Sequence, residues 1–143
     1  MASITGANSV VMLAIAALYP VAQQLQGFAA DDVFDSEGIA SAEILTGVDG
    51  NMSAGWVYVP IKQGYTLQAD SASNALFEAW YQAQQAIQEL YFASATIHLP
   101  ATSRSYVMTK GVLTLHKPTP DVKKVLQPRK YEITWSKIFA GPL

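Results

Sequence analysis

Apolar and polar residues alternate with a period of two along much of the chain, which is the pattern of β-strands with one buried face. The alternation is clearest in residues 95–99 (ATIHL), 105–116 (SYVMTKGVLTLH) and 131–138 (YEITWSKI), and residues 65–69 (YTLQA) follow the same pattern. It predicts a strand in each of these segments. Further strands are expected at residues 42–45 and 56–61.

The apolar run at residues 9–18 (SVVMLAIAAL) has no alternation. An unbroken run of this kind indicates a strand covered on both faces, and a short buried helix would give the same pattern. No Lys or Arg precedes the run, and it is far shorter than the roughly 20 residues that a bilayer span needs. We therefore expect a buried strand and no membrane insertion.

One later segment changes to a helical period. Its apolar residues are spaced so that they fall on one helix face, which predicts a helix over about residues 72–91. Polar side chains just before it can cap the first free amides. The residues on the apolar face are Leu76, Trp80, Ala83, Ile87 and Leu90, and the cap candidates are Asp70, Ser71 and Ser73.

Taken together, these elements predict a mainly β (α+β) fold. Six or seven strands and one helix, separated by proline and glycine turn signals, favour an antiparallel β-sandwich or barrel with the helix on its flank. No internal repeat or linker divides the sequence. We expect residues 1–143 to form a single domain, which is long enough to bury a core without disulfides.

The chain has few charges for its size. Charged residues make up 14% of the sequence and apolar residues 50%, whereas about 25% of the residues in typical soluble domains are charged. Such a surface indicates that other copies of the chain cover part of it. The formal net charge is -2, so no basic field would concentrate nucleic acid.

The sequence offers little for catalysis or metal binding. It has no cysteine, and the common nucleophile, zinc, phosphate-loop and dinucleotide motifs are missing. His98 and His116 fall in strand patterns, where a solvent-facing histidine is expected more often than a ligand. Asp49-Gly50-Asn51 lacks the remaining oxygen ligands of a calcium loop. We therefore predict that the chain is not an enzyme and binds neither a metal nor a cofactor.

Two short charged clusters are expected to be solvated. The acidic cluster could hold a divalent cation, but acidic runs of this length are more often hydrated loops. The basic cluster is too small for a phosphate-binding surface, and we expect it to pair with the acidic loop of a neighbouring subunit. The acids are Asp31, Asp32, Asp35 and Glu37, and the basic residues are Lys123, Lys124, Arg129 and Lys130.

A glycine-rich stretch at about residues 46–56 follows the predicted strand at residues 42–45. Glycines let the backbone adopt angles that other residues resist, and the Val, Met and Trp of the stretch offer apolar contacts. A metal loop, a catalytic turn, a long hairpin packed on its own domain, and an arm that reaches another copy are the alternatives. The candidate residues of an inter-subunit arm are Gly47, Val48, Asp49, Gly50, Asn51, Met52, Gly55 and Trp56.

The order of four segments resembles the tail tube proteins of contractile-tailed bacteriophages over nearly the whole chain. The shared layout is a glycine-rich arm after the second strand, a strand that leads directly into the single helix, a central strand and a closing strand. The segments are GVDGNMSAGWV, YTLQADSASNALFEAWYQAQ, LPATSRSYVMTKGVLTLHKP and KKVLQPRKYEITW.

This resemblance implies a structural virion protein. Homo-hexameric rings would stack into the hollow inner tail tube, a conduit for genome delivery, and the glycine-rich arm would reach a subunit in the neighbouring ring. Tail sheath, baseplate and tape-measure proteins would be its partners, and DNA would pass through the lumen without specific binding. The protein would assemble in the host bacterial cytoplasm and end in the phage tail.

Two alternatives to a tail tube stay open on the sequence. Ring components of the phage baseplate and of type VI secretion share the general layout, although the lack of a long insertion favours the plain tube unit. A small enzyme or ligand-binding β-barrel would instead be a monomer or dimer with a cavity and a strongly perturbed acid or histidine.

Overall fold

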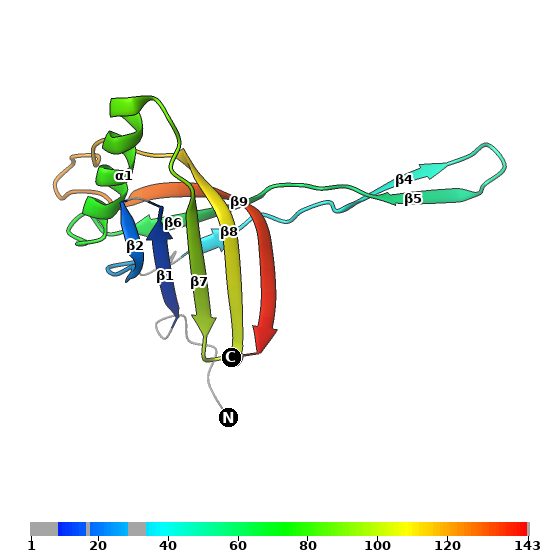
Figure 1. Cartoon of the computed structure of the whole chain (residues 1–143), viewed down its shortest axis with the longest axis horizontal. Helices are drawn as coiled ribbons and strands as arrows, with labels where there is room; N and C mark the ends of the chain where they lie inside the picture. The colour runs from blue at the N-terminus through cyan, green and yellow to red at the C-terminus, as the bar shows by residue number, and fades with distance from the viewer. Residues whose placement is uncertain (1–8, 17, 29–33, 143) are drawn as a thin grey trace.

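The computed structural model describes residues 9–16, 18–28 and 34–142. One helix and nine strands lie within these ranges (Figure 1). In chain order they are β1 (Val10–Ile15), β2 (Tyr19–Gln24), β3 (Phe34–Ser36), β4 (Ala42–Thr46), β5 (Met52–Trp56), β6 (Ile61–Leu67), α1 (Asn74–Ile87), β7 (Ala93–Leu99), β8 (Arg104–Leu115) and β9 (Arg129–Pro142).

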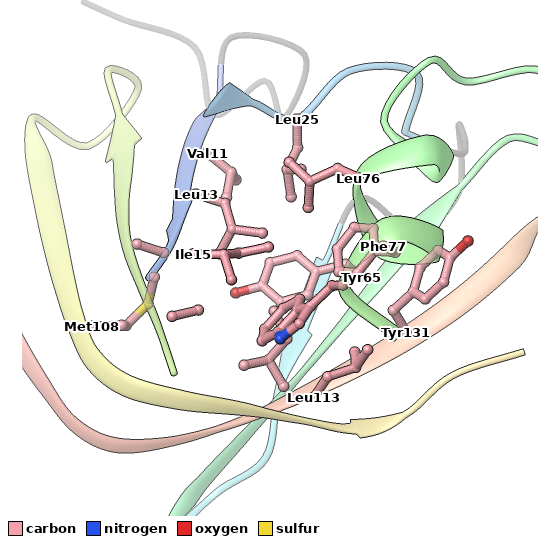
Figure 2. Close-up of a cluster of buried hydrophobic side chains, with 14 of the residues drawn as sticks. Val11, Leu13, Ile15, Leu25, Tyr65, Leu76, Phe77, Met108, Leu113 and Tyr131 are labelled. Atoms are coloured by element: carbon pink, nitrogen blue, oxygen red, sulfur yellow. The ribbon is translucent and has the colours of Figure 1, made fainter. Parts of the chain in front are cut away.

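Seven of the strands form one antiparallel sheet in the order β2-β1-β7-β8-β9-β6-β3. The sheet curls strongly around the core (Figure 2). Its two ends approach each other, because Phe28 after β2 forms a bridge to Leu67 of β6, and the N–H of Gln68 donates to the carbonyl of Gly27 at 2.7 Å. The predicted mainly β antiparallel architecture with one flanking helix is confirmed.

The core lies on the concave side of the sheet, under α1 (Figure 2). β1 shows how the pattern produces it, because Val11, Leu13 and Ile15 are buried and alternate with half-buried residues. The expected strand at residues 9–18 is therefore confirmed, but only one of its faces is fully covered. The largest fully buried side chains of the core are Trp80, Trp135, Tyr65, Tyr131 and Phe77.

The alternation does not predict β2, which lies at an edge of the sheet and is almost entirely exposed. An edge strand has no buried face to impose a period of two, and it tolerates Pro20 because one side of its backbone needs no hydrogen-bond donor.

α1 is shorter than the predicted helix over about residues 72–91, because the chain turns at Gln88. Gln88 takes a left-handed conformation with φ 56°, and its N–H donates to the carbonyl of Gln84 at 2.7 Å. The side chain of Gln84 then accepts the N–H of Tyr91 at 3.1 Å. Leu90 continues the apolar spacing of the sequence but lies beyond the helix and is exposed.

The serines before α1 do not cap it as predicted. Ser73 is the N-cap residue but makes no side-chain cap bond, and its hydroxyl instead accepts the N–H of Gln26 at 2.8 Å. The hydroxyl of Ser71 donates to the carbonyl of the same Gln26. Both serines therefore tie the start of the helix to the segment after β2.

The helix is fixed on β9 mainly through Tyr131. The rings of Phe77 and Tyr131 stack with centroids 4.1 Å apart and planes 9° from parallel. The Tyr131 hydroxyl donates to Oδ1 of Asn74 at 2.9 Å, and burial raises the pKa of Tyr131 to about 12. The hydroxyl therefore keeps the proton that it donates to the helix.

Arg129 adds a buried charge beside this contact. Its side chain is 4% exposed, and Nη1 donates to Oε1 of Glu78 on α1 at 2.6 Å. Nη2 donates to the carbonyl of Lys117 at 2.8 Å. These bonds link the helix, β9 and the loop after β8. Loss of Glu78 would leave the buried guanidinium without a compensating charge.

For two of the four residues of the basic cluster, these pairings replace the expected contact with a neighbouring subunit, and for Lys123 and Lys124 it stays a prediction. Arg129 pairs with Glu78, and Nζ of Lys130 lies 3.5 Å from Oδ2 of Asp35 in the same chain. The other side of the Asp35 carboxylate accepts the N–H of Gly64 at 3.0 Å. Asp31 and Asp32 of the acidic cluster lie outside the described residues.

β8 and β9 change the face that they turn toward the core near Lys110. The cross-strand pairs Gly111–Trp135 and Met108–Ile138 both face the core, although they lie three positions apart on each strand, an odd spacing that regular alternation would place on opposite faces. Lys110 between them has φ 52°, and the pairing of β7 with β8 shifts register at the same level. The two strands thus bend at Gly111, with the left-handed residue one position earlier.

Trp80→Ala tests how firmly the helix is docked. Trp80 is fully buried, and its Nε1 donates to the carbonyl of Tyr91 at 3.0 Å. We expect the free energy of unfolding to fall by about 3–5 kcal/mol, measured by urea denaturation under circular dichroism. Ile87, at the end of the same helix, is 52% exposed. Ile87→Ala should therefore lower the free energy of unfolding by less than about 1 kcal/mol. Equal losses would contradict the packing described.

Gly111→Ala tests the bend. A Cβ at Gly111 would overlap the ring of Trp135, whereas a Cβ at Gly141 meets no atom within 4 Å. We expect Gly111→Ala to lower the free energy of unfolding by about 1–3 kcal/mol, as overpacked cores do. Gly141→Ala, in the same strand pair, is the control and should cause no loss. A neutral Gly111→Ala would mean that Trp135 can move without cost.

Candidate functional site

β4 and β5 pair with each other in a separate two-stranded sheet that projects far from the body (Figure 1). We call residues 42–56 the arm. The predicted arm at residues 46–56 is thus part of a longer hairpin, and the strand predicted at residues 56–61 is wrong. β5 instead lies inside the glycine-rich stretch, and residues 57–60 form no strand.

The turn of the arm is held by its own polar groups. The N–H of Gly47 donates to the carbonyl of Asn51 at 2.8 Å, and the carboxylate of Asp49 accepts the backbone N–H of Asn51 at 3.1 Å and its side-chain Nδ2 at 2.7 Å. Gly50 has φ 87°, where a side chain would be strained. Asp49, Gly50 and Asn51 therefore serve to close a hairpin turn.

The register divides the arm into two faces, because directly paired residues point to the same side of a hairpin. Ala42 pairs with Trp56, Ile44 with Ala54, and Thr46 with Met52. This face, the arm face, is apolar but for Thr46. Its large members are exposed, with Ile44 at 57%, Met52 at 64% and Trp56 at 70%.

The tip and the root of the arm are apolar as well. Val48 in the turn is fully exposed. At the root, the ring of Tyr58 meets Trp56 edge-on with centroids 6.3 Å apart, and Tyr58 is also exposed. Trp56 is therefore not a core residue.

A groove of about 680 Å³ lies between the arm root and the outer face of β8 and β9. We call it the root groove. Val112 and Thr134 form a cross-strand pair in it, and they point away from the core that the adjacent Leu113 and Ile133 enter. Other lining residues are Trp56, Tyr58, Phe92, Lys110, Lys137, Ile138 and Phe139.

The two histidines are half-buried, contrary to the expected solvent-facing positions. The ring of His116 stacks on Tyr81 with centroids 4.3 Å apart and lies 5.8 Å from the ring of Tyr131. Burial and, to a lesser extent, the positive charge of Arg129 lower the pKa of His116. His98 lies in β7 at a distance along the sheet, paired with Val10 and Ser105.

Within residues 9–16, 18–28 and 34–142, no three potential metal ligands come together. Among the residues that the structure describes, no helix has the length and apolar character needed to cross a bilayer. The feature that stands out is therefore the arm with the root groove beside it.

Sequence patterns indicated only part of this surface. Val48, Met52 and Trp56 stand out as large apolar residues among glycines, whereas Ile44 is recognised only once the register is known. A usable signal is symmetry about Asp49, which lies midway between Ile44 and Ala54 and between Thr46 and Met52. The root groove combines distant segments and has no such signal.

Comparisons with known proteins give both a family and a fold. A model of the family described as tail fiber protein gp32 matches residues 2–139. No curated protein sequence matches the chain significantly. Among solved structures, the tube-terminating cap of the anti-feeding prophage has a TM-score of 0.66 and 12% identity, over 100% of this chain and 93% of that chain.

Two further assemblies contain similar chains. One is the sheath-tube complex of the PVC extracellular contractile injection system, with a TM-score of 0.60 and 8% identity, over 93% of this chain and 88% of that chain. The other is the baseplate of the anti-feeding prophage, with a TM-score of 0.59 and 8% identity, over 94% of this chain and 92% of that chain. At such identities the likeness shows the fold, and it confirms the resemblance to tail tube proteins at that level.

By the family match this chain belongs to the family described as tail fiber protein gp32, and its fold is similar to that of tube and cap proteins of contractile injection systems.

Proposed function

We propose that the chain is the repeating subunit of a tail tube, in which homo-hexameric rings stack into a hollow tube inside a contractile sheath. The observation that carries this proposal is the arm. It is a hairpin with an apolar face that the described part of its own chain leaves exposed. Exposed apolar surfaces of this kind mark contacts with other proteins.

Stacked rings need two kinds of contact for each subunit. One joins neighbours around the ring, and the other joins successive rings along the axis. A projecting hairpin suits the second contact, because it reaches beyond the body to which it belongs. The low share of charged residues, 14%, fits a chain whose surface is covered in both directions.

The proposed tube is a conduit for the genome in the tail of the virion. A chain with a formal net charge of -2 has no excess of positive charge to retain DNA, and Arg129 and Lys130 already pair with carboxylates of their own chain. Sheath, baseplate and tape-measure proteins are the proposed partners, and the host cytoplasm is the proposed place of assembly.

A second candidate is a ring that ends the tube or joins it to the baseplate. The similarity to a tube-terminating cap and to a baseplate chain favours it. The two candidates differ in how they grow, since a terminal ring stops at one or two layers and a tube subunit forms polymers that lengthen with concentration. Negative-stain electron microscopy with sedimentation velocity, over a range of concentrations, separates them.

Shortening the arm tests the proposed role. We expect a chain in which an Asn-Gly turn replaces residues 43–55 to fold normally, because the pair Ala42–Trp56 can be closed by a two-residue turn. It should form no stacked rings under conditions in which the full chain does, as judged by electron microscopy and sedimentation. Tubes of normal length from the shortened chain would refute the role of the arm.

A matched pair of variants tests the arm face itself. Ile44→Ser with Met52→Ser replaces two of the three large apolar side chains of the arm face, and Leu45→Ser changes the opposite side of the same strand, where Leu45 is 67% exposed. Both should change the free energy of unfolding by less than about 0.5 kcal/mol per site, as exposed positions do. Only the first should lose assembly in sedimentation, and equal assembly in both would contradict the assignment of the face.

A further inference from the structure

We propose that the root groove is the docking site for the arm of a second copy of this chain. The proposal rests on the proposed function, because it names the surface that receives the arm. The groove lies on the body at the base of the arm, so each copy would carry one docking element and one receiving surface.

The walls of the groove are apolar and open to solvent. Tyr58 is 85% exposed and Phe139 is 56% exposed, and Val112 contributes to the floor between them. The arm presents side chains of the same character, namely Val48 at its tip with Ile44 and Met52 behind it. Contact between the two surfaces would bury apolar side chains that each separate copy leaves exposed to water.

Charge favours the same pairing. Residues 42–56 contain two acids, Glu43 and Asp49, and no basic residue, whereas Lys110 and Lys137 line the groove and no acidic residue does. Within the described ranges neither lysine forms an ion pair. An acidic arm entering a groove edged by two ammonium groups gains electrostatic complementarity.

The arm that fills the groove must come from another copy. Cross-strand pairing from Ala42–Trp56 to Thr46–Met52 keeps the hairpin extended, and its tip points away from the body (Figure 1). Val48 therefore does not return to its own root. A contact between two different surfaces of identical chains is head-to-tail, and it repeats from one copy to the next.

Cysteine cross-linking tests the contact in the full-length chain. The sequence has no cysteine, so Val48→Cys at the arm tip and Phe139→Cys on the groove wall each introduce one thiol. The two chains, one with a size tag, are mixed under assembly conditions, oxidised and run on a non-reducing gel. Val112→Cys gives a second groove position, in case loss of the Phe139 ring weakens docking.

The control is Val125→Cys, on a loop outside the groove and 70% exposed. Docking raises the effective concentration of the paired thiols, so we expect the Val48→Cys chain to link to a groove cysteine about tenfold more than to the control. Equal yields at all three positions would overturn the proposal.

Charge reversal is the second measurement. Lys137→Glu should raise the concentration needed for half-maximal assembly about tenfold, and Glu43→Lys in the same chain, at an exposed arm position outside the turn, should restore it. Lys124→Glu, an exposed change outside the groove, should have no such effect. A loss of assembly that Glu43→Lys leaves uncorrected would count against the pairing of arm and groove.

The outcomes separate this inference from the proposed function. If tubes form, the shortened arm abolishes them, and no groove cysteine links to the arm, the inference fails and the proposed function stands. If no copies associate at any concentration, the proposed function and the inference both fail.

Discussion

The contact between Gly111 and Trp135 is the constraint on which the rest of the structure depends. Only a residue without a Cβ lets the indole lie against β8, and directly beside it Lys110 takes φ 52° and the two long strands change the face that they turn to the core. Trp135 also pairs with Ile61, the first residue of β6 after the arm root. The indole of Trp135 is therefore part of the core, lies beside the bend of β8, and lies at the same level as the point where the chain enters the sheet from the arm.

β9 carries this organisation along its length. At its start, Arg129 and Tyr131 hold α1 through an ion pair, whose guanidinium is buried and whose Glu78 carboxylate is partly exposed, and through a stacked ring. Farther along the strand, Lys137 and Phe139 line the groove. No residue of the helix lines the groove, and the polar contact of the helix with β9 is costly to break because Arg129 is almost fully buried.

How much the sequence predicts follows from burial. Tyr131, Ile133 and Trp135 alternate because one face of β9 is buried, so that strand and the centre of α1 around Trp80 are predictable. Where burial is missing, the pattern fails. β2 and β5 are exposed and carry no period of two, and the end of α1 is set by the left-handed Gln88 while the apolar spacing runs on to Leu90. The root groove is assembled by sheet register from segments far apart, which no local pattern records.

One fold serves cap, tube and baseplate chains in the assemblies to which this chain is similar, so the fold does not decide the position in a tail. What differs between a repeating and a terminal ring is the number of axial surfaces that must be filled. A terminal ring joins the tube on one side only, so either a docking arm or a receiving groove is enough for it. This chain carries an apolar arm with two acids and an apolar groove lined by two lysines. In the docking that we propose, these are the two complementary surfaces that propagation requires, which is the reason for proposing the repeating subunit before the terminal ring.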